Sequence, residues 1–390
     1  MKHSTIMVIL LTVFFFTAFP GISFAVENDE QFKLAENVKA AILMEQDTGT
    51  ILYEENSDDP LPPASMTKIM TMLLVMEALD AGKIRLDDTV RTSAYAASMG
   101  GSQIFLEEGE EMTVEELLLA VAIASANDAS VALAEHIAGS EEVFVDMMNK
   151  RAGELGLKNT RFQNATGLPA ENHFSSARDI AIMSRELLKH EEITKYTGQY
   201  ESYLREDTED KFWLVNTNRL VKFYPGVDGL KTGFTNEARY CLSATAEKNG
   251  MRVIAVVFGA PTAKERNKQI TRMLDYAFSQ YETVPVYEKG ATVGEIVVQK
   301  GEVEQVPVQT KDKVSFLKKK GEKTEDVKPV LRFNETLQAP VKKGDVVGHI
   351  VLQKDGKELG KTDLVASKDV APASWWTLYK RAFGQFTKVD

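Results

Sequence analysis

Two serines and two lysines stand in short motifs whose spacing suits covalent catalysis. Ser65 and Lys68 are three positions apart, Asn127 closely follows Ser125, and Lys231 opens a Lys-Thr-Gly triplet. A serine hydroxyl is a weak nucleophile until a positioned base takes its proton. On a helix, side chains at positions i and i+3 lie about 5–6 Å apart between Cβ atoms, so Lys68 can reach Ser65. Because chance rarely supplies all three motifs in this order, they indicate acyl transfer through a serine.

Lys68 can serve as the base only if its amine is neutral. The ordinary lysine pKa of about 10.4 leaves the group protonated at neutral pH. Lys68 begins an apolar helical pattern over residues 67–79, and Lys231 would supply a second cation nearby. Burial and a neighbouring like charge both disfavour the ammonium form. The sequence therefore predicts a buried Lys68 with a lowered pKa beside Ser65.

The middle motif supplies groups that move and hold protons. Ser125 can pass a proton between Lys68 and a leaving amine, as general acid–base catalysis requires. Asn127 can orient Lys68 and a substrate amide through its side-chain carbonyl and amide. The backbone N–H groups at the start of the Ser65 helix would face a developing oxyanion.

The third motif is expected to bind the substrate. Lys231, Thr232 and a further arginine would hold an anionic group of the substrate. The strand that carries Gly233 and Phe234 is expected at the edge of a sheet, where it could give a second N–H to the oxyanion. Gly233 would leave room for a substrate lying along that strand.

Other reactive residues fit less demanding roles. Ser315 and Lys318 repeat the spacing of the first motif within a β-rich segment, and we interpret this as a chance match. The single cysteine, Cys241, excludes a disulfide framework and a thiolate metal cluster, and we expect it to be buried. The histidines lack metal-ligand spacing, so we expect no metal and no other cofactor.

The composition is that of a globular protein with an acidic excess. The chain has 390 residues, of which 44% are hydrophobic, and the 46 Lys+Arg against 57 Asp+Glu give a formal net charge of −11. The length predicts at least two domains. The lack of a basic excess argues against nucleic acid as a partner.

Residues 26–281 are predicted to form the catalytic domain. Alternating apolar residues predict a hairpin over residues 38–54 and strands at 239–247 and 252–259, and helical periodicity covers 113–137, 177–188 and 262–281. This order predicts an α/β (α+β) fold in which helices cover a central antiparallel sheet and a helical insertion interrupts it.

The rest of the chain has a different pattern. Residues 282–368 have short alternating runs and an Asp355-Gly356 turn, which predict a small all-β domain. Residues 369–390 form an amphipathic pattern with tryptophan and tyrosine on one side and basic residues on the other. Such a helix is expected to lie in a membrane surface, although docking on the protein's own surface is the alternative.

The N-terminus resembles a secretory signal peptide. Lys2 precedes an apolar run over residues 6–19, and a small-residue pattern ends at Ala25. The apolar run is shorter than the roughly 20 residues that span a membrane. We therefore expect cleavage after residue 25, export, and a peripheral location at the outer face of the cytoplasmic membrane.

The motifs resemble those of the serine-type D-alanyl-D-alanine carboxypeptidases, the low-molecular-mass penicillin-binding proteins. The similarity extends from about residue 38 to the C-terminus and covers the segments 64–71, 125–129, 155–160, 216–220 and 227–233. It implies Ser65 as acylated nucleophile, Lys68 as general base, Ser125 as proton relay and Lys231 as binder of the substrate carboxylate. It also implies a domain of the type that β-lactamases share. Ala126 departs from the family, in which many relatives carry glycine.

The resemblance also implies roles for Phe234 and Arg266. Phe234 would give its N–H to the oxyanion hole, and Arg266 would steady the terminal carboxylate of the substrate. For Arg266 the alternative is a solvent-facing helix residue.

The family implies a peptidoglycan stem peptide as substrate and β-lactam antibiotics as covalent inhibitors. We expect removal of the terminal D-alanine from the pentapeptide, and a D,D-endopeptidase acting on crosslinks is the nearest alternative. A class A β-lactamase needs a glutamate after the middle motif for deacylation, and residues 155–170 contain no carboxylate. A penicillin-sensing or scaffold module would not need the intact serine and lysine motifs.

Overall fold

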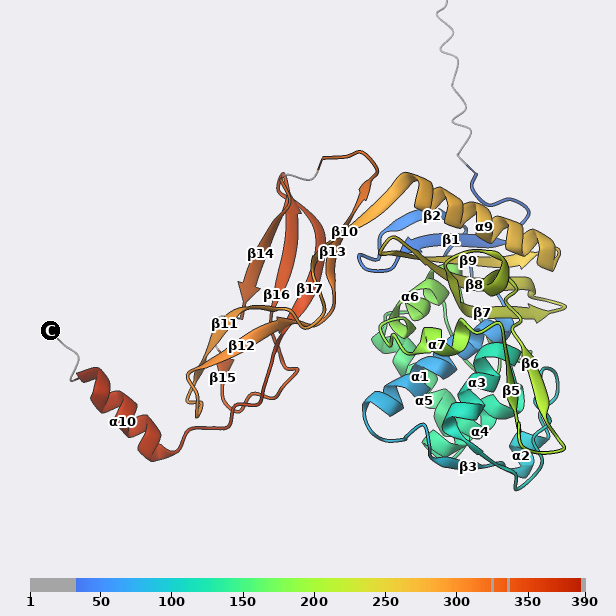
Figure 1. Cartoon of the computed structure of the whole chain (residues 1–390), viewed down its shortest axis with the longest axis horizontal. Coiled ribbons are helices and arrows are strands. Elements are labelled where there is room, and N and C mark those ends of the chain that lie inside the picture. The colour runs from blue at the N-terminus through green and yellow to red at the C-terminus, as the bar shows by residue number, and fades with distance from the viewer. Residues whose placement is uncertain (1–32, 324–325, 335–336, 387–390) are drawn as a thin grey trace, which may run out of the picture. The chain divides into compact units, whose positions relative to one another are not determined.

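The computed structural model describes residues 33–323, 326–334 and 337–386, so the predicted signal peptide lies outside the described residues. A five-stranded antiparallel sheet in the order β2-β1-β9-β8-β7 carries the Lys-Thr-Gly triplet on β7, its edge strand (Figure 1). The strands are β1 (Ala40–Glu45), β2 (Ile51–Glu55), β7 (Val227–Thr235), β8 (Arg239–Lys248) and β9 (Met251–Ala260).

Helices cover both faces of this sheet, which buries β1 and β9 on both sides. Successive residues of a strand point to opposite faces, so Ile42 joins the core beneath the helical insertion and Leu43 joins the core beneath α9 (Ala263–Gln280). Thr262 begins α9 by accepting a hydrogen bond from the Glu265 N–H. The mixed α/β fold predicted from the sequence is confirmed.

The segment between β2 and β7 contains the helical insertion. Its helices are η1 (Ala64–Thr67), α1 (Lys68–Asp80), α2 (Ala94–Ala97), α3 (Val114–Ala124), α4 (Asn127–Ala138), α5 (Glu141–Glu154), α6 (Ala177–Leu187), α7 (Ile193–Thr197) and α8 (Leu220–Phe223). Two small antiparallel sheets of two strands each pair β3 (Thr89–Arg91) with β4 (Glu111–Thr113) and β5 (Glu201–Leu204) with β6 (Phe212–Val215).

The continuous helix predicted over residues 113–137 is wrong. Two helices occupy this stretch because Ser125 adopts a left-handed backbone conformation with φ of +64°, which ends α3. The spacing of apolar residues continues across residue 125, so the sequence pattern gave no sign that the chain changes direction there. Sequence reasoning also missed α5, whose buried side is a narrow stripe of Phe144, Met148 and Ala152.

The C-terminal segment forms the predicted β structure. A six-stranded sheet has the order β14-β16-β17-β12-β11-β15, and β10 pairs with β13. Asp355 and Gly356, both with positive φ, form the predicted turn between β16 and β17. The strands are β10 (Tyr281–Tyr287), β11 (Thr292–Gln299), β12 (Gln305–Thr310), β13 (Val314–Lys319), β14 (Lys328–Phe333), β15 (Leu337–Gln338), β16 (Val346–Lys354) and β17 (Lys357–Ala366).

The second Ser-x-x-Lys sequence lies in β13, not on a helix. A strand places residues three apart on opposite faces. The Ser315 hydroxyl donates to Asp47, whereas Lys318 pairs with Glu282. This copy cannot form a nucleophile–base pair, so its interpretation as a chance match is confirmed.

The last described element is α10 (Trp375–Phe386), which lies within the segment predicted to be an amphipathic helix. Within the part of the chain that the structure describes, no helix combines the length and apolar character needed to cross a membrane.

Candidate active site

The junction of η1 and α1 brings the predicted nucleophile and base together. Ser65 lies in η1 and Lys68 begins α1, one turn later. The Lys68 Nζ lies 3.2 Å from the Ser65 Oγ. Ala64, directly before the nucleophile, has a φ of +46°, a strained conformation of the kind that functional sites retain. The local spacing therefore forms the contact that proton abstraction from Ser65 requires.

The Lys68 side chain is fully buried and held by three oxygens. Besides Ser65, its Nζ contacts the Asn127 Oδ1 at 2.6 Å and the Thr166 carbonyl oxygen at 2.7 Å. Burial first, and then the nearby charge of Lys231, hold the pKa of Lys68 well below its usual range, while Asp128 opposes them. Both causes expected from the sequence are present, and they favour the neutral amine.

Lys231 and Arg266 are two further cationic side chains that are buried. Burial, followed by the charge of Arg266, lowers the pKa of Lys231 to about 7. Burial also lowers the pKa of Arg266 to about 10. Arg266 lies in the first turn of α9 and is only 5% exposed, so the solvent-facing alternative for this residue is wrong. An anion binding beside the pair would favour both charged forms.

The edge strand packs directly on the segment that carries the nucleophile. A Cβ atom added to Gly233 would lie 2.8 Å from the Pro63 carbonyl oxygen and 3.2 Å from the Ala64 Cβ. Glycine is thus required here by the approach of the two backbones, a reason that differs from the expected room for substrate. Thr232 donates from its hydroxyl to Thr217. Phe234 is 48% exposed, and its ring lies tilted against that of Tyr240 with the centroids 4.5 Å apart.

Sequence and structure comparisons agree on one family. The profile of the D-alanyl-D-alanine carboxypeptidase family (peptidase S11) matches residues 26–262, and that of the penicillin-binding protein 5 C-terminal domain matches residues 281–372. The chain is 57% identical over 380 residues to D-alanyl-D-alanine carboxypeptidase DacF of Bacillus subtilis, covering 97% of this chain and 98% of the relative. The chain belongs to the D-alanyl-D-alanine carboxypeptidase family. It is a serine-type D-alanyl-D-alanine carboxypeptidase. The comparisons favour neither a D,D-endopeptidase nor a class A β-lactamase.

Solved structures similar to the carboxypeptidase include penicillin-binding proteins. Penicillin-binding protein 5 of Haemophilus influenzae has a TM-score of 0.67 at 35% identity, covering 86% of this chain and 98% of that one. Penicillin-binding protein D2 of Listeria monocytogenes, solved in its ampicillin-bound form, has a TM-score of 0.54 at 33% identity, covering 63% and 99%.

Of the remaining predicted site residues of the carboxypeptidase, the structure brings Asn127 but not the Ser125 hydroxyl into hydrogen-bonding contact with Lys68. Asn127 contacts Lys68 as expected, but no hydrogen bond joins the Ser125 hydroxyl to Ser65 or Lys68 among the described residues. Ser125 is buried at the corner between α3 and α4, two positions before Asn127. Cys241 is fully buried on β8, and burial raises the pKa of its thiol to about 11, so it behaves as the predicted core residue.

Sequence reasoning missed the loop that supplies the Thr166 carbonyl. Asn164 shapes it by accepting hydrogen bonds from the N–H groups of Thr166 and Gly167. His173 packs beneath the same region, where its Nε2 lies 2.8 Å from the Thr67 Oγ1, and burial lowers its pKa to about 4. The Asn-Ala-Thr-Gly turn sequence at 164–167 was a signal for this loop.

Replacing Gly167 with alanine should destabilise the carboxypeptidase more than an ordinary glycine replacement. Gly167 has a φ of +84°, and an added Cβ would meet the Ala64 carbonyl oxygen at 1.9 Å. Overpacking of this kind costs about 1–3 kcal/mol beyond the left-handed strain. Gly156→Ala is the matched control, because φ is +71° there and nothing lies within 4 Å. Denaturant midpoints measure both, and equal losses would contradict the close packing.

Proposed function

We propose that Ser65 is the nucleophile that this carboxypeptidase acylates, that Lys68 is its general base, and that the substrate is the pentapeptide stem of peptidoglycan. The observation that carries the proposal is the buried Lys68 amine 3.2 Å from the Ser65 hydroxyl. A lysine with a lowered pKa can accept the hydroxyl proton near neutral pH.

The reaction follows from these positions. The Ser65 Oγ attacks the carbonyl carbon of the penultimate D-alanine, and Lys68 takes the hydroxyl proton. The bond to the terminal D-alanine then breaks, and the proton passes to the departing amine through Lys68 and Ser125. Water attacks the resulting ester, which releases the tetrapeptide and restores Ser65.

The remaining site residues would bind the substrate. Lys231 and Arg266 are buried cations available to its terminal carboxylate, and Thr232 follows Lys231 on β7. The backbone N–H groups of Ser65 and Phe234 would stabilise the oxyanion. β-Lactams would acylate the same serine, and the ampicillin-bound form of the Listeria relative supports this part of the proposal.

A peptide assay and a mass measurement test this function together. A peptide that ends in D-Ala-D-Ala should lose one alanine, and penicillin should leave a lasting adduct on the peptide that contains Ser65. Cleavage of a crosslinked dimer without alanine release would favour an endopeptidase. Rapid release of hydrolysed penicillin without a lasting adduct would favour a β-lactamase. An adduct on another residue would overturn the assignment of Ser65.

We also propose that the chain is exported and that α10 binds the membrane surface. Four aromatic side chains on this helix are well exposed: Trp375, Trp376 and Tyr379 stack on one another, and the Phe383 ring lies tilted against Tyr379. Lys380 lies over the Trp376 ring at 5.5 Å. Aromatic rings with adjacent basic groups favour the headgroup zone of an anionic bilayer.

Replacing both Trp375 and Trp376 with serine should abolish cosedimentation with phosphatidylglycerol vesicles. The variant should still release D-alanine from a soluble peptide at the unchanged rate, because the substitutions lie outside the catalytic site. Trp213→Ser is the matched control, since Trp213 and Trp376 are both 56% exposed. If the double variant still sediments with vesicles, this helix does not bind the membrane.

A further inference from the structure

The loop of residues 98–110, between α2 and β4, holds Asn127 through its backbone. The Ser102 carbonyl accepts a hydrogen bond from the Asn127 N–H at 2.7 Å, and the Gly100 carbonyl accepts one from the Asn127 Nδ2 at 2.6 Å. The packing is tight, because a Cβ on Gly101 would lie 2.9 Å from the same Nδ2. Since the Asn127 Oδ1 contacts the Lys68 Nζ, the loop fixes one partner of the proposed base.

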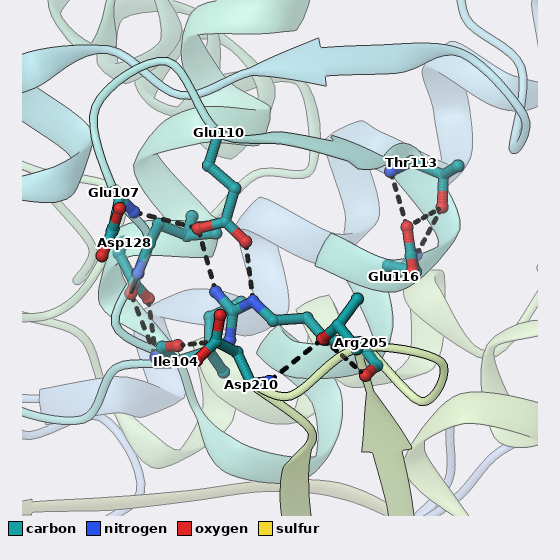
Figure 2. Close-up of polar contacts among 10 residues, drawn as sticks. Ile104, Glu107, Glu110, Thr113, Glu116, Asp128, Arg205 and Asp210 are labelled. Atoms are coloured by element: carbon teal, nitrogen blue, oxygen red, sulfur yellow. Dashed lines mark hydrogen bonds and ion pairs between the residues drawn. The ribbon is translucent and has the colours of Figure 1, made fainter.

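Two charged side chains hold this loop from different elements (Figure 2). Asp128, in the first turn of α4, accepts hydrogen bonds from the N–H groups of Ile104 and Leu106 at 3.0 and 3.1 Å. Arg205 reaches across from the end of β5 and donates through its Nη1 to the Ile104 carbonyl at 3.1 Å. Both polar backbone groups of Ile104 are thus engaged, one by each side chain.

Arg205 also forms a two-point ion pair with the far end of the loop. Its Nε and Nη2 donate to the two carboxylate oxygens of Glu110 at 2.7 and 3.0 Å. Both side chains are largely buried, with 14% and 22% exposed. Burial alone would raise the pKa of Glu110, but hydrogen bonds from Arg205 and from the Glu107 N–H lower it. Two parallel hydrogen bonds from one guanidinium to one carboxylate hold the two side chains in a defined orientation, in addition to the attraction between their charges.

The backbone between these anchors is strained. Phe105, flanked by the two residues that donate to Asp128, has a φ of +58°, and its ring is 63% exposed. A bulky residue keeps such a conformation only where its surroundings enforce it. Arg205 itself has a φ of +53°, and its carbonyl accepts hydrogen bonds from the Thr208 N–H and hydroxyl. The anchor and the loop are therefore held rigidly against each other.

We propose that Arg205, with Glu110, is a positioning residue for acylation. It fixes the 98–110 loop, which fixes Asn127, and Asn127 holds the Lys68 amine in line with Ser65. This inference rests on the proposed function of Lys68. A displacement of about 1 Å at a reacting group can cost as much as about 100-fold in rate, so a loosened loop should slow the covalent step more than it weakens binding.

Arg205→Met should lower the first-order rate constant of acylation by saturating penicillin about tenfold. The dissociation constant of the noncovalent complex should change less than about threefold, because Arg205 contacts only the loop. Arg205→Lys restores the cation but not the two-point pair, and it should recover part of the rate. Stopped-flow acylation over a range of penicillin concentrations separates the two constants.

Arg151→Met is the matched control. Arg151 has a 21% exposed side chain and pairs with Glu77 and Glu186, away from the loop. It should lose comparable stability while keeping its acylation rate. Glu110→Gln, which preserves the shape of the pair, serves if Arg205→Met fails to fold, and it should also slow acylation.

The outcomes separate this inference from the function on which it rests. If Arg205→Met and Glu110→Gln acylate at the wild-type rate while Lys68→Met is inactive, the positioning role is wrong and the proposed base stands. If Lys68→Met acylates normally, the proposed function fails. If the rates fall equally in Arg205→Met and Arg151→Met, the effect is general destabilisation and the positioning role is again wrong.

Discussion

Ser65→Ala should remove the covalent adduct with penicillin and slow the release of D-alanine by roughly 10⁴- to 10⁶-fold. The alanine side chain has no oxygen to attack the substrate carbonyl. Lys68 can only accept a proton, so it cannot take over the role of the nucleophile. The side chain lost is small, so the fold should remain stable. Intact-protein mass after penicillin treatment and alanine release from a D-Ala-D-Ala peptide measure the two effects.

The chain supplies its own control for this experiment. Ser315 has the same spacing to a lysine as Ser65, but it lies on β13 and donates to Asp47. Ser315→Ala should therefore leave acylation unchanged. An adduct that persists in Ser65→Ala, or that disappears in Ser315→Ala, would show that the nucleophile has been assigned wrongly.

Lys68→Met should lower the acylation rate by about 10²- to 10⁴-fold, the range that a positioned general base contributes. Methionine preserves much of the buried volume but cannot accept a proton from Ser65. It also leaves the Asn127 Oδ1 and the Thr166 carbonyl without their shared donor, so some stability should be lost as well. Lys318→Met is the corresponding control on the second motif and should acylate normally.

The pH dependence of the wild-type rate provides a second test of Lys68. Burial and Lys231 lower the pKa of its amine. The active form is the neutral one, so acylation should be lost as pH falls through this lowered pKa. Lys68→Met should lack this acidic limb. An acidic limb that persists in Lys68→Met would have to be assigned to another group.

The Ser65–Lys68 contact could be predicted because it is local. Three positions on a helix determine the approach of the two side chains, and the Lys-Thr-Gly triplet on an edge strand supplied the second cation. The lowered pKa followed from the same reasoning, since apolar neighbours and a like charge act in the same direction. A role for Arg266 in steadying the substrate carboxylate could be inferred only from the family resemblance, because its helix pattern also suits a surface residue.

The backbone groups of the site could not be predicted. The carbonyls of Thr166, Gly100 and Ser102 hold Lys68 or Asn127, and every residue type carries a carbonyl. The corner at Ser125 was hidden for a similar reason, because apolar periodicity continues across it. The side chains that could do the chemistry were identifiable from the sequence, whereas the loops that orient these side chains depend on tertiary structure.

The pairing of β1 with β9 sets the order in which the molecule can be completed. β1 pairs locally with β2, but on its other edge Ala40 lies opposite Phe258 and Glu45 lies opposite Val253, so this second neighbour becomes available only after more than half of the chain has been made. Contacts between such distant segments form slowly, because a long loop must close first. The nascent chain therefore cannot complete this sheet early in synthesis, and the second edge of β1 and its Leu43 side stay exposed until β9 and α9 are available to cover them.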